Sequence, residues 1–454
     1  MPLLAMTAAR LALVGLAATS LCLGASARGQ DSAPPGAPTL TPDGLVWQTA
    51  GGELMLMPGG RLQVDGAFFS RQTPKSGLYL RRSIVELRGW VGHTFYFDFG
   101  GDFAPVPPPG TQVAPSVLPA ADNFLAYAPF GDALVVQAGQ FDVPFTLDNR
   151  TSDTETDFIE RSMVARSLGA PRNKDVGGMV HGLLWRRRVY YSVGLFNGEG
   201  AGFRNLDNQA DAIGRVVVTP LAGSDGPLSG VSVGGSAWRG NHVLGPEAPV
   251  QATPGGVVFF QPEWTGSFGS PTFALHEQGT IQAFAGEVSF PIGSRFGVRG
   301  ELVWKKQQLV EATVLPSGLN PIGAATLDGI AAYGEVWFWL LGDQRLRPAA
   351  GYEMPVRPGW TPGPPLEPAL MLALRGEVLK EDLGTDTTSL GDPGVATTRV
   401  VSGTAGLNYW RGRLVRLSAN YVLNYWSGTS ETILALIAAG RLEHEVLFRF
   451  ALSL

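Results

Sequence analysis

Apolar and polar side chains alternate along this 454-residue chain in repeated segments from about residue 60 to the end. Successive side chains of a β-strand point to opposite faces, so this pattern predicts strands with one apolar and one wet face. Gly, Pro, Asn and Asp separate segments of about 9 to 12 residues, which suits tilted strands that cross a bilayer. The last segment shows both faces clearly: Val446, Phe448, Phe450, Leu452 and Leu454 oppose Glu445, Arg449 and Ser453.

Alternation alone does not distinguish a membrane barrel from a soluble β-sandwich. Aromatic residues near the strand ends favour the barrel, because rings there would form the girdles at the two membrane interfaces. One closed sheet also accounts for the length, since a barrel grows by adding hairpins and no composition break divides the chain after residue 45. The aromatic residues concerned are Trp90, Trp185, Tyr190, Trp304, Trp337, Trp339, Trp410, Tyr425 and Trp426.

The first 27 residues have the features of a cleaved export signal. Arg10 precedes an apolar run over residues 11–23, and residues 25–27 supply the small side chains that a signal peptidase requires. Cys22 would suit a lipoprotein signal, but Leu21 stands where that signal needs a small residue. No later segment has the roughly 18 apolar residues of a membrane-spanning helix. The chain is therefore expected either as a secreted soluble protein or as a barrel in the outer membrane.

These patterns predict three regions: a signal peptide over 1–27, a flexible mature N-terminus over 28–58 and a transmembrane β-barrel domain over 59–454. The segments number sixteen to eighteen. We expect an all-β, antiparallel barrel of about sixteen strands, because bacterial single-chain barrels have even strand numbers and sixteen strands leave an aqueous channel. Residues 346–354 and 432–439 are the uncertain strands. Short turns at 131–132 and 186–188 are expected on the periplasmic side, and the longer excursions 102–120, 142–175, 240–279 and 380–397 outside the cell or folded inward.

Charge and composition argue against several other functions. A formal net charge of −5 does not suit a general nucleic-acid-binding protein, which is usually strongly basic. The histidines lack the close spacing of a metal site, and no catalytic arrangement stands out. We therefore expect no enzyme activity, no metal and no cofactor. The histidines are His93, His181, His242, His276 and His444.

A series of short motifs appears in a familiar order between residues 60 and about 220. It starts with residues 60–65 (GRLQVD), 80–82 (LRR) followed by Glu86, and 96–98 (YFD). It continues with 138–145 (AGQFDVPF), 158–162 (FIERS), 171–177 (PRNKDVG), 196–198 (FNG) and 214–215 (GR), and echoes follow at 406–410 and 420–421. In this order the chain resembles the phosphate-selective porin O/P family.

The resemblance implies a sixteen-stranded, trimeric barrel with an anion-binding pore, in which the loop after Pro144 and Phe145 folds into the lumen as a constriction loop over 142–175. The chain departs from the family at Gln140 and Asp142, where the family usually carries basic residues. The expected loop is also mixed in charge. Its basic residues are Arg150, Arg161, Arg166, Arg172 and Lys174, and its acidic residues are Asp148, Asp153, Glu155, Asp157 and Glu160.

An anion pathway needs positive charge along the lumen, because a desolvated anion must regain interactions from the pore wall. The guanidinium of arginine suits this role, since it binds two oxygens at once and stays charged. The strand phase predicts Arg82, Arg88, Arg299, Arg375, Arg416 and Arg449 in the lumen. The resemblance implies that Arg150, Arg161 and Arg166 lie on the inward loop. The alternative is structural: wall pairs with Glu86, Glu301, Glu377 and Glu445, and a salt-bridge lattice that ties the loop to the wall.

Four functions are compatible with these observations. The first is passive diffusion of small anions, with phosphate or polyphosphate as candidate solutes, through a homotrimeric porin in the outer membrane of a Gram-negative bacterium. The second is a general or weakly cation-preferring porin on the same barrel. The third is a secreted soluble β-protein, such as a binding module or a carbohydrate-active enzyme, and the fourth is a structural membrane role without conduction. The expected partners are outer-membrane lipid and small anions, and not nucleic acid.

Overall fold

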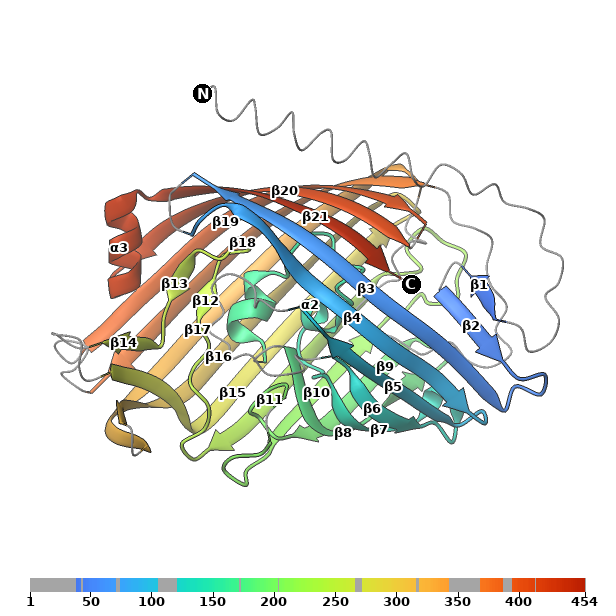
Figure 1. Cartoon of the computed structure of the whole chain (residues 1–454), viewed down its shortest axis with the longest axis horizontal. Helices are drawn as coiled ribbons and strands as arrows, with labels where there is room; N and C mark the ends of the chain where they lie inside the picture. The colour runs from blue at the N-terminus through green and yellow to red at the C-terminus, as the bar shows by residue number, and fades with distance from the viewer. Residues whose placement is uncertain are drawn as a thin grey trace.

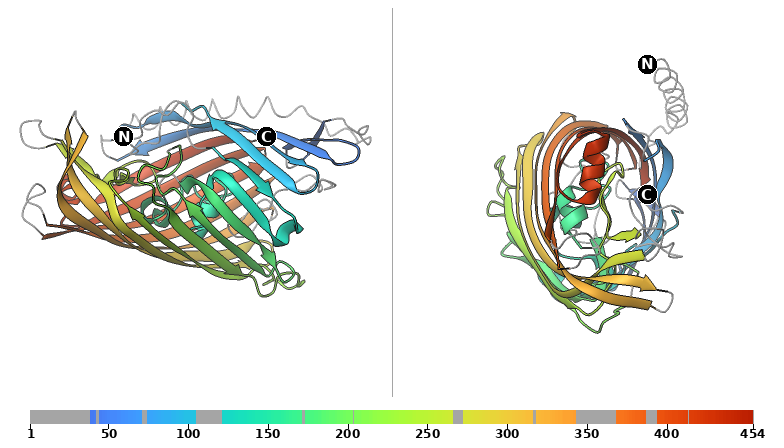
Figure 2. Two further views of the ribbon diagram at one scale, coloured as in Figure 1. Left: turned by 90° about the horizontal axis from the view of Figure 1, so that it is seen from below. Right: turned by 90° about the vertical axis from the view of Figure 1, so that its left-hand side faces the viewer.

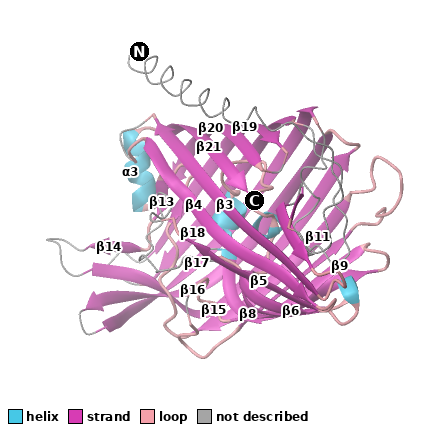
Figure 3. Ribbon diagram, turned by 45° about the vertical axis from the view of Figure 1, so that its right-hand side comes forward, coloured by secondary structure: helices cyan, strands magenta, loops and turns pink. Residues whose placement is uncertain are grey.

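The computed structural model describes residues 38–41, 44–70, 74–104, 121–170, 173–202, 204–265, 272–315, 318–342, 368–386, 394–412 and 414–453. These residues form a long, tilted antiparallel barrel with a few short helices (Figures 1 and 3). The signal segment expected over 1–27 and the uncertain strand at 346–354 lie outside the described residues.

Sixteen strands of the main sheet pair into a closed ring. Closure comes from β21, which pairs antiparallel with β3 and sets Arg449 opposite Asp65. The predicted sixteen-stranded barrel is confirmed. In chain order, its strands are β3 (Leu54–Phe69), β4 (Gly77–Val91), β5 (Phe95–Asp102), β6 (Asn123–Tyr127), β7 (Val135–Asp142), β8 (Lys174–Leu184), β9 (Val189–Phe196), β10 (Asp211–Val218), β11 (Ser232–His242), β15 (Thr272–Ile292), β16 (Phe296–Leu315), β17 (Gly318–Leu341), β18 (Ala369–Thr385), β19 (Gly394–Arg411), β20 (Val415–Gly428) and β21 (Leu442–Ser453).

Short elements accompany the ring. The chain enters through β2, which pairs with β3, so ordered structure begins before the expected boundary at residue 59 and the first barrel strand begins at Leu54. The other short elements are β1 (Thr39–Thr41), β2 (Gly44–Gln48), η1 (Gly131–Ala133), α2 (Leu147–Arg150), η2 (Val164–Leu168), β12 (Gln251–Ala252), β13 (Val258–Phe260), β14 (Glu263–Thr265) and α3 (Glu431–Ala439).

The two faces of the barrel strands carry opposite chemistry. On β21, Phe448 is 45% exposed on the outer face, whereas Arg449 is 3% exposed on the inner face. The same phase holds along the other strands, so the outer surface carries a broad apolar belt and the inner surface carries most of the charged wall residues. An apolar belt around a closed sheet is what a lipid bilayer requires. Among the described residues, no helix has the length and apolar character needed to cross a membrane.

Several aromatic residues expected in an interfacial girdle face the lumen instead. Trp339 and Trp410 pack against each other with ring centroids 5.1 Å apart, and the Arg416 guanidinium lies 5.0 Å from the Trp410 ring. The girdle prediction is wrong for these residues because they occupy the inward phase of their strands. The aromatic residues buried inside the barrel are Trp90, Tyr190, Trp337, Trp339, Trp410 and Trp426, whereas Trp185 and Tyr425 are exposed.

The two ends of the barrel differ. Tight turns over residues 92–94, 185–188 and 293–295 lie at one end of the barrel, and the helix α3 lies at the other end (Figure 1). Residues 432–439 lie in the helix α3 at that second end rather than in a strand. Glu431 in its first turn complements the helix dipole, and Gly440 ends the helix at φ 129°.

Candidate functional site: the filled lumen and its charged wall

The segment 143–173 leaves β7, folds into the barrel and returns to β8, as expected for a constriction loop (Figures 1 and 2). Its apolar side chains pack against the inner wall, and Phe145 is fully buried with its ring centroid 5.6 Å from that of Trp238. Its backbone is held as well, since the amides of Leu147 and Asp148 donate to the Glu301 carboxylate on β16. We call the described residues of this stretch, 143–170 and 173, the first inward segment.

A second inward segment, residues 243–262, contains the hairpin β12–β13. The Gln251 amide donates to Glu381 at 2.8 Å, and the Gly255 amide donates to Glu445 at 2.8 Å, so the hairpin is tied to β18 and β21. The Phe259 ring lies 6.3 Å from Trp426 on β20. The sequence left 240–279 either outside or inward, and the hairpin shows that part of this stretch enters the barrel.

The two inward segments and the wall from β7 to β20 form one apolar core. This core covers the inner face of the wall that contains β16 and β19, where the side chains of Val303 and Val400 are fully buried. Burial of so much apolar surface fixes both segments in place. The members from the inward segments are Val143, Phe145, Met163, Val164, Leu168, Ala170, Ala248, Val257, Phe259 and Phe260.

Ion pairs on this side are nearly free of water. Arg215 donates to both oxygens of Glu287 at 2.9 and 2.6 Å, and the two side chains are 0% and 3% exposed. Arg449 makes an equivalent pair with Asp65, with both contacts at 2.7 Å. We call β10 to β21, with these pairs, the dry wall.

Four of the predicted lumen arginines lie on the dry wall, and each contacts the first inward segment. Arg299 pairs with Asp157 at 2.6 Å and with Glu335 of the neighbouring strand. The other contacts are those of Arg375 with the Glu160 carbonyl at 3.2 Å, Arg416 with the carbonyls of Thr154 and Thr156, and Arg449 with the Glu160 carboxylate at 3.2 Å. These contacts tie the segment to the wall.

The three arginines predicted on the inward loop bind backbone carbonyls. Arg150 donates to the Asp142 carbonyl at 2.6 Å, and Arg161 donates to the Asp148 and Thr151 carbonyls at 2.9 and 2.6 Å. Arg166 donates to the Arg161 carbonyl at 2.8 Å and, across the lumen, to the Ala252 carbonyl at 2.6 Å. Arg166 therefore links the two inward segments.

The wall formed by β3 and β4 keeps its lumen-facing arginines partly in water. The side chains of Arg61, Arg81, Arg82 and Arg88 are 17%, 13%, 15% and 32% exposed. The register of β3 and β4 shifts at Gln63, and this bulge lets two successive residues, Arg81 and Arg82, both face inward. We call β3 to β8 the wet wall.

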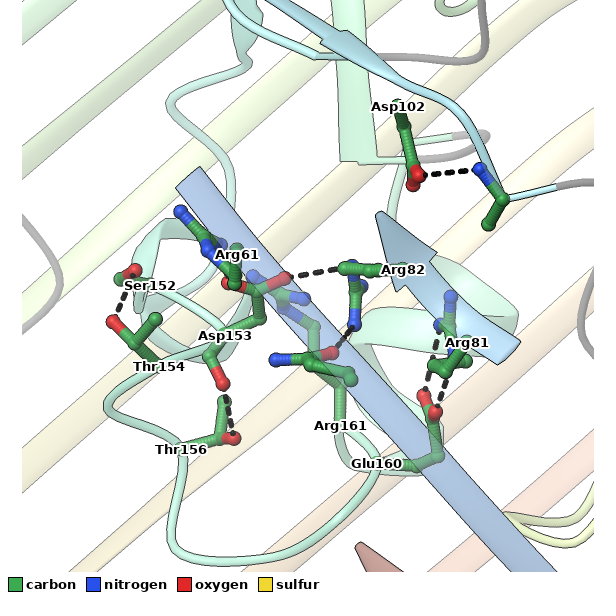
Figure 4. A network of polar contacts seen from close by, with 12 residues as sticks. Arg61, Arg81, Arg82, Asp102, Ser152, Asp153, Thr154, Thr156, Glu160 and Arg161 are labelled. Atoms are coloured by element: carbon green, nitrogen blue, oxygen red, sulfur yellow. Dashed lines mark hydrogen bonds and ion pairs between the residues drawn. The ribbon is translucent and has the colours of Figure 1, made fainter. Parts of the chain in front are cut away.

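The wet arginines face acidic groups of the first inward segment (Figure 4). Arg81 binds Glu160 at 2.9 Å, Arg82 binds Asp153 at 2.7 Å, and Arg61 also pairs with Asp153. Glu86 accepts contacts from Arg88 at 3.5 Å and from Arg61 at 3.9 Å. The four wet arginines thus form a charged network with Glu86, Asp153 and Glu160.

Glu160 remains ionised in this cluster. Burial would raise its pKa, but the charges of Arg81 and Arg449 outweigh burial and hold the pKa of this carboxyl well below its usual range.

Nearer the ends of β7 and β8, Lys174 bridges Asp122 at 2.8 Å and Asp142 at 3.0 Å, so this part of the wet wall has an acidic excess.

Sequence reasoning placed Arg82 and Arg88 on the inward face, where they lie, but missed Arg61 and Arg81. Strict alternation assigns Arg81 to the face opposite Arg82, and no residue type in the sequence marks the bulge that turns it inward. The second inward segment was missed as a definite element for another reason: its hairpin strands have two and three residues, too short for a periodic signal.

A closed, sixteen-stranded barrel with an apolar outer belt and inward segments defines the class of outer-membrane porins. Residues 59–238 match the model of the family described as phosphate-selective porin O and P, the family whose motif order this part of the chain resembles. A search of curated proteins gave no match.

Solved outer-membrane proteins share the architecture. A loop L8 deletion mutant of OmpT, an outer membrane protein of Vibrio cholerae, is 12% identical, with a TM-score of 0.52 over 88% of this chain and 100% of that chain. An anion-selective porin from Comamonas acidovorans is 10% identical, with a TM-score of 0.47 over 88% of this chain and 100% of that chain. At such identities the likeness to the first protein concerns the fold alone.

Proposed function

We propose that this porin conducts small anions by passive diffusion along the wet wall, between β3–β5 and the first inward segment. The observation that carries the proposal is that, among the described wall arginines that face the lumen, the partly exposed ones lie on this wall, while those of the dry wall are buried in ion pairs or, for Arg416, in hydrogen bonds. An anion passing Arg61, Arg81, Arg82 and Arg88 would meet several weak sites in succession, which permits both entry and release.

The substrate class follows from the same side chains. Guanidinium groups bind planar or tetrahedral oxyanions with two hydrogen bonds, so phosphate and small carboxylates are the candidate solutes. We further propose a cleaved signal over residues 1–27, a homotrimer in the outer membrane, and no catalytic activity. Three arginines of the first inward segment add positive potential to the path, because the carbonyl groups that they contact do not neutralise their charge. They are Arg150, Arg161 and Arg166.

A general or weakly cation-preferring porin is the second candidate. Asp122 and Asp142 favour it, because they leave an acidic excess around Lys174 at one end of the wet wall. The two candidates differ in a measurable sign: the reversal potential in a salt gradient has opposite polarity for anion-preferring and cation-preferring channels.

The decisive experiment measures reversal potentials of the purified protein in planar bilayers under a KCl gradient. Removing one guanidinium at about 6 Å from the path in water raises the local energy of a monovalent anion by about 0.7 kcal/mol and lowers that of a monovalent cation by the same amount. Arg82→Ala or Arg88→Ala should therefore each lower the anion-to-cation permeability ratio by a factor between about three and about ten. Arg187→Ala is the matched control, because Arg187 is 58% exposed in the turn after β8 and lies away from the path.

Two outcomes would contradict the proposal: cation preference in the unmodified channel, or an unchanged ratio in both wet-wall variants. Block of the chloride current by added phosphate would assign an oxyanion site to the same path. A folded barrel without any conductance would exclude both porin candidates.

A further inference from the structure

His242, the last residue of β11, lies at the base of the second inward segment and is surrounded by carboxylates. Its Nδ1 lies 3.3 Å from Asp207, and its Nε2 lies 3.5 Å from both Asp211 and Glu277. The imidazole is 1% exposed, and each of the three carboxylates is at most 1% exposed. A buried carboxylate is stable only if it is paired or hydrogen-bonded, so this arrangement favours a positive charge on the imidazole.

The surroundings add little further positive charge. Glu199 lies in the connection from β9 to β10, as does Asp207, and Asp175 on β8 acts on Asp211. Lys305 on β16 acts on Glu277 and Asp211 and supplies a single positive charge. Among the described residues, no group of His, Asp and Glu side chains is arranged to hold a metal ion. The charged groups facing the cluster are thus Asp175, Glu199, Asp207, Asp211, Glu277 and Lys305.

The cluster joins elements that hold the start of the second inward segment. Asp207 accepts a hydrogen bond from the Val243 amide at 2.8 Å, and the Gly245 amide donates to the Glu277 carbonyl at 2.8 Å. Asp211 also accepts from Trp238 at 2.8 Å, which leaves its other oxygen facing His242. The imidazole therefore ties β10, β15 and the β9–β10 connection to the point where the chain turns into the lumen.

We propose that His242, as an imidazolium, is a proton-dependent latch that seats the second inward segment, and that loss of its proton releases this segment from the barrel wall. Without the proton, Asp207, Asp211 and Glu277 face one another around a neutral ring in a dry site. The repulsion is relieved when the β9–β10 connection and the base of the segment separate and water enters. The latch is independent of ion preference, so it does not rest on anion conduction.

Hydrogen exchange of the folded protein in lipid tests the latch directly. The protection of amides in residues 243–262, including the Gly255 amide that binds Glu445, reports on seating of the segment. After correction for intrinsic exchange rates, protection should fall about tenfold between about pH 6 and about pH 10, because a one-unit difference in proton affinity between the two states changes their ratio tenfold. Protection that does not depend on pH would overturn the proposal.

Variants separate the latch from general loosening of the barrel. His242→Gln should show low protection of residues 243–262 at every pH, whereas His181→Gln, a buried histidine that contacts Gln137 at 3.2 Å, should keep the pH profile of the unmodified protein. Asp207→Asn removes one partner from a connection outside the strands and should shift the loss of protection to lower pH. If His242→Gln or Asp207→Asn showed the same pH dependence of amide protection as the unmodified protein, the latch would be overturned.

Discussion

The wet wall and the dry wall carry the same residue types, yet they differ in what those residues can do. Arg88 on β4 is 32% exposed, whereas Arg215 on β10 has no exposed surface and binds both oxygens of Glu287. An exposed charge interacts with passing ions through water, while a buried pair is neutralised and mainly preserves its own geometry. The proposed conduction path and the shape of the barrel thus depend on different walls.

The largest expected effect comes from breaking a dry pair. Arg215→Met leaves Glu287 buried without its partner, which should cost about 3 to 5 kcal/mol of unfolding free energy. The double variant Arg215→Met, Glu287→Leu replaces both charges with apolar groups. Its free energy of unfolding should be close to that of the unmodified protein. Denaturant unfolding of the barrel, followed by its shift in gel mobility, measures both. Equal destabilisation in the single and double variants would show that the pair does not act as a unit.

Arg416 tests the connection between the dry wall and the first inward segment. Its guanidinium donates to the Thr156 carbonyl and to Asn408, where the contact is 2.8 Å, and Arg416→Ala removes both. Hydrogen bonds to a charged group contribute about 1.5 to 3 kcal/mol, so a loss of about 2 kcal/mol and faster proteolysis within 143–173 are expected. Arg399→Ala is the control, since Arg399 faces outward on β19. Unchanged proteolysis in Arg416→Ala would mean that packing alone holds the segment.

Much of this division follows from local sequence, and part of it does not. Alternation is local, so it predicted the inward phase of Arg299, Arg375, Arg416 and Arg449, together with the closing strand. Whether an inward arginine is wet or dry depends on which segments cover it, and that depends on contacts between residues far apart in the chain. The second inward segment supplies part of this cover, and its short hairpin has no periodic signal.

Departures from regular strand geometry also could not be predicted from the sequence. The bulge between β3 and β4 moves Arg81 into the lumen, because one additional residue reverses the phase that alternation assigns. The tryptophans were predicted at the membrane interface but lie in the lumen. The preference of tryptophan for the interface is statistical, and Trp337 and Trp339 instead fill space beside the first inward segment and the neighbouring strands. Both outcomes depend on tertiary packing rather than on the residue type.

Glu160 lies at the border between the two walls and gives the smallest expected effect. It pairs with wet Arg81 at 2.9 Å and dry Arg449 at 3.2 Å, so Glu160→Gln should cost only about 1 kcal/mol, within the range of partly exposed pairs. It also removes a negative charge from the proposed path and should raise the anion-to-cation permeability ratio by up to about threefold. Arg187→Ala again serves as the control.

The pH dependence of this variant has a definite sign. A carboxyl with a lowered pKa stabilises the fold above its unfolded pKa of about 4.3, and the contribution is lost as the pH falls through the folded value. Because Arg81 and Arg449 hold the pKa of Glu160 well below its usual range, the difference between Glu160→Gln and the unmodified protein should stay constant from about pH 7 to about pH 5 and shrink only below about pH 4. Bilayer recordings and denaturant unfolding across this range measure it, and a difference that already disappears near pH 5 would mean that the two arginines do not control this carboxylate.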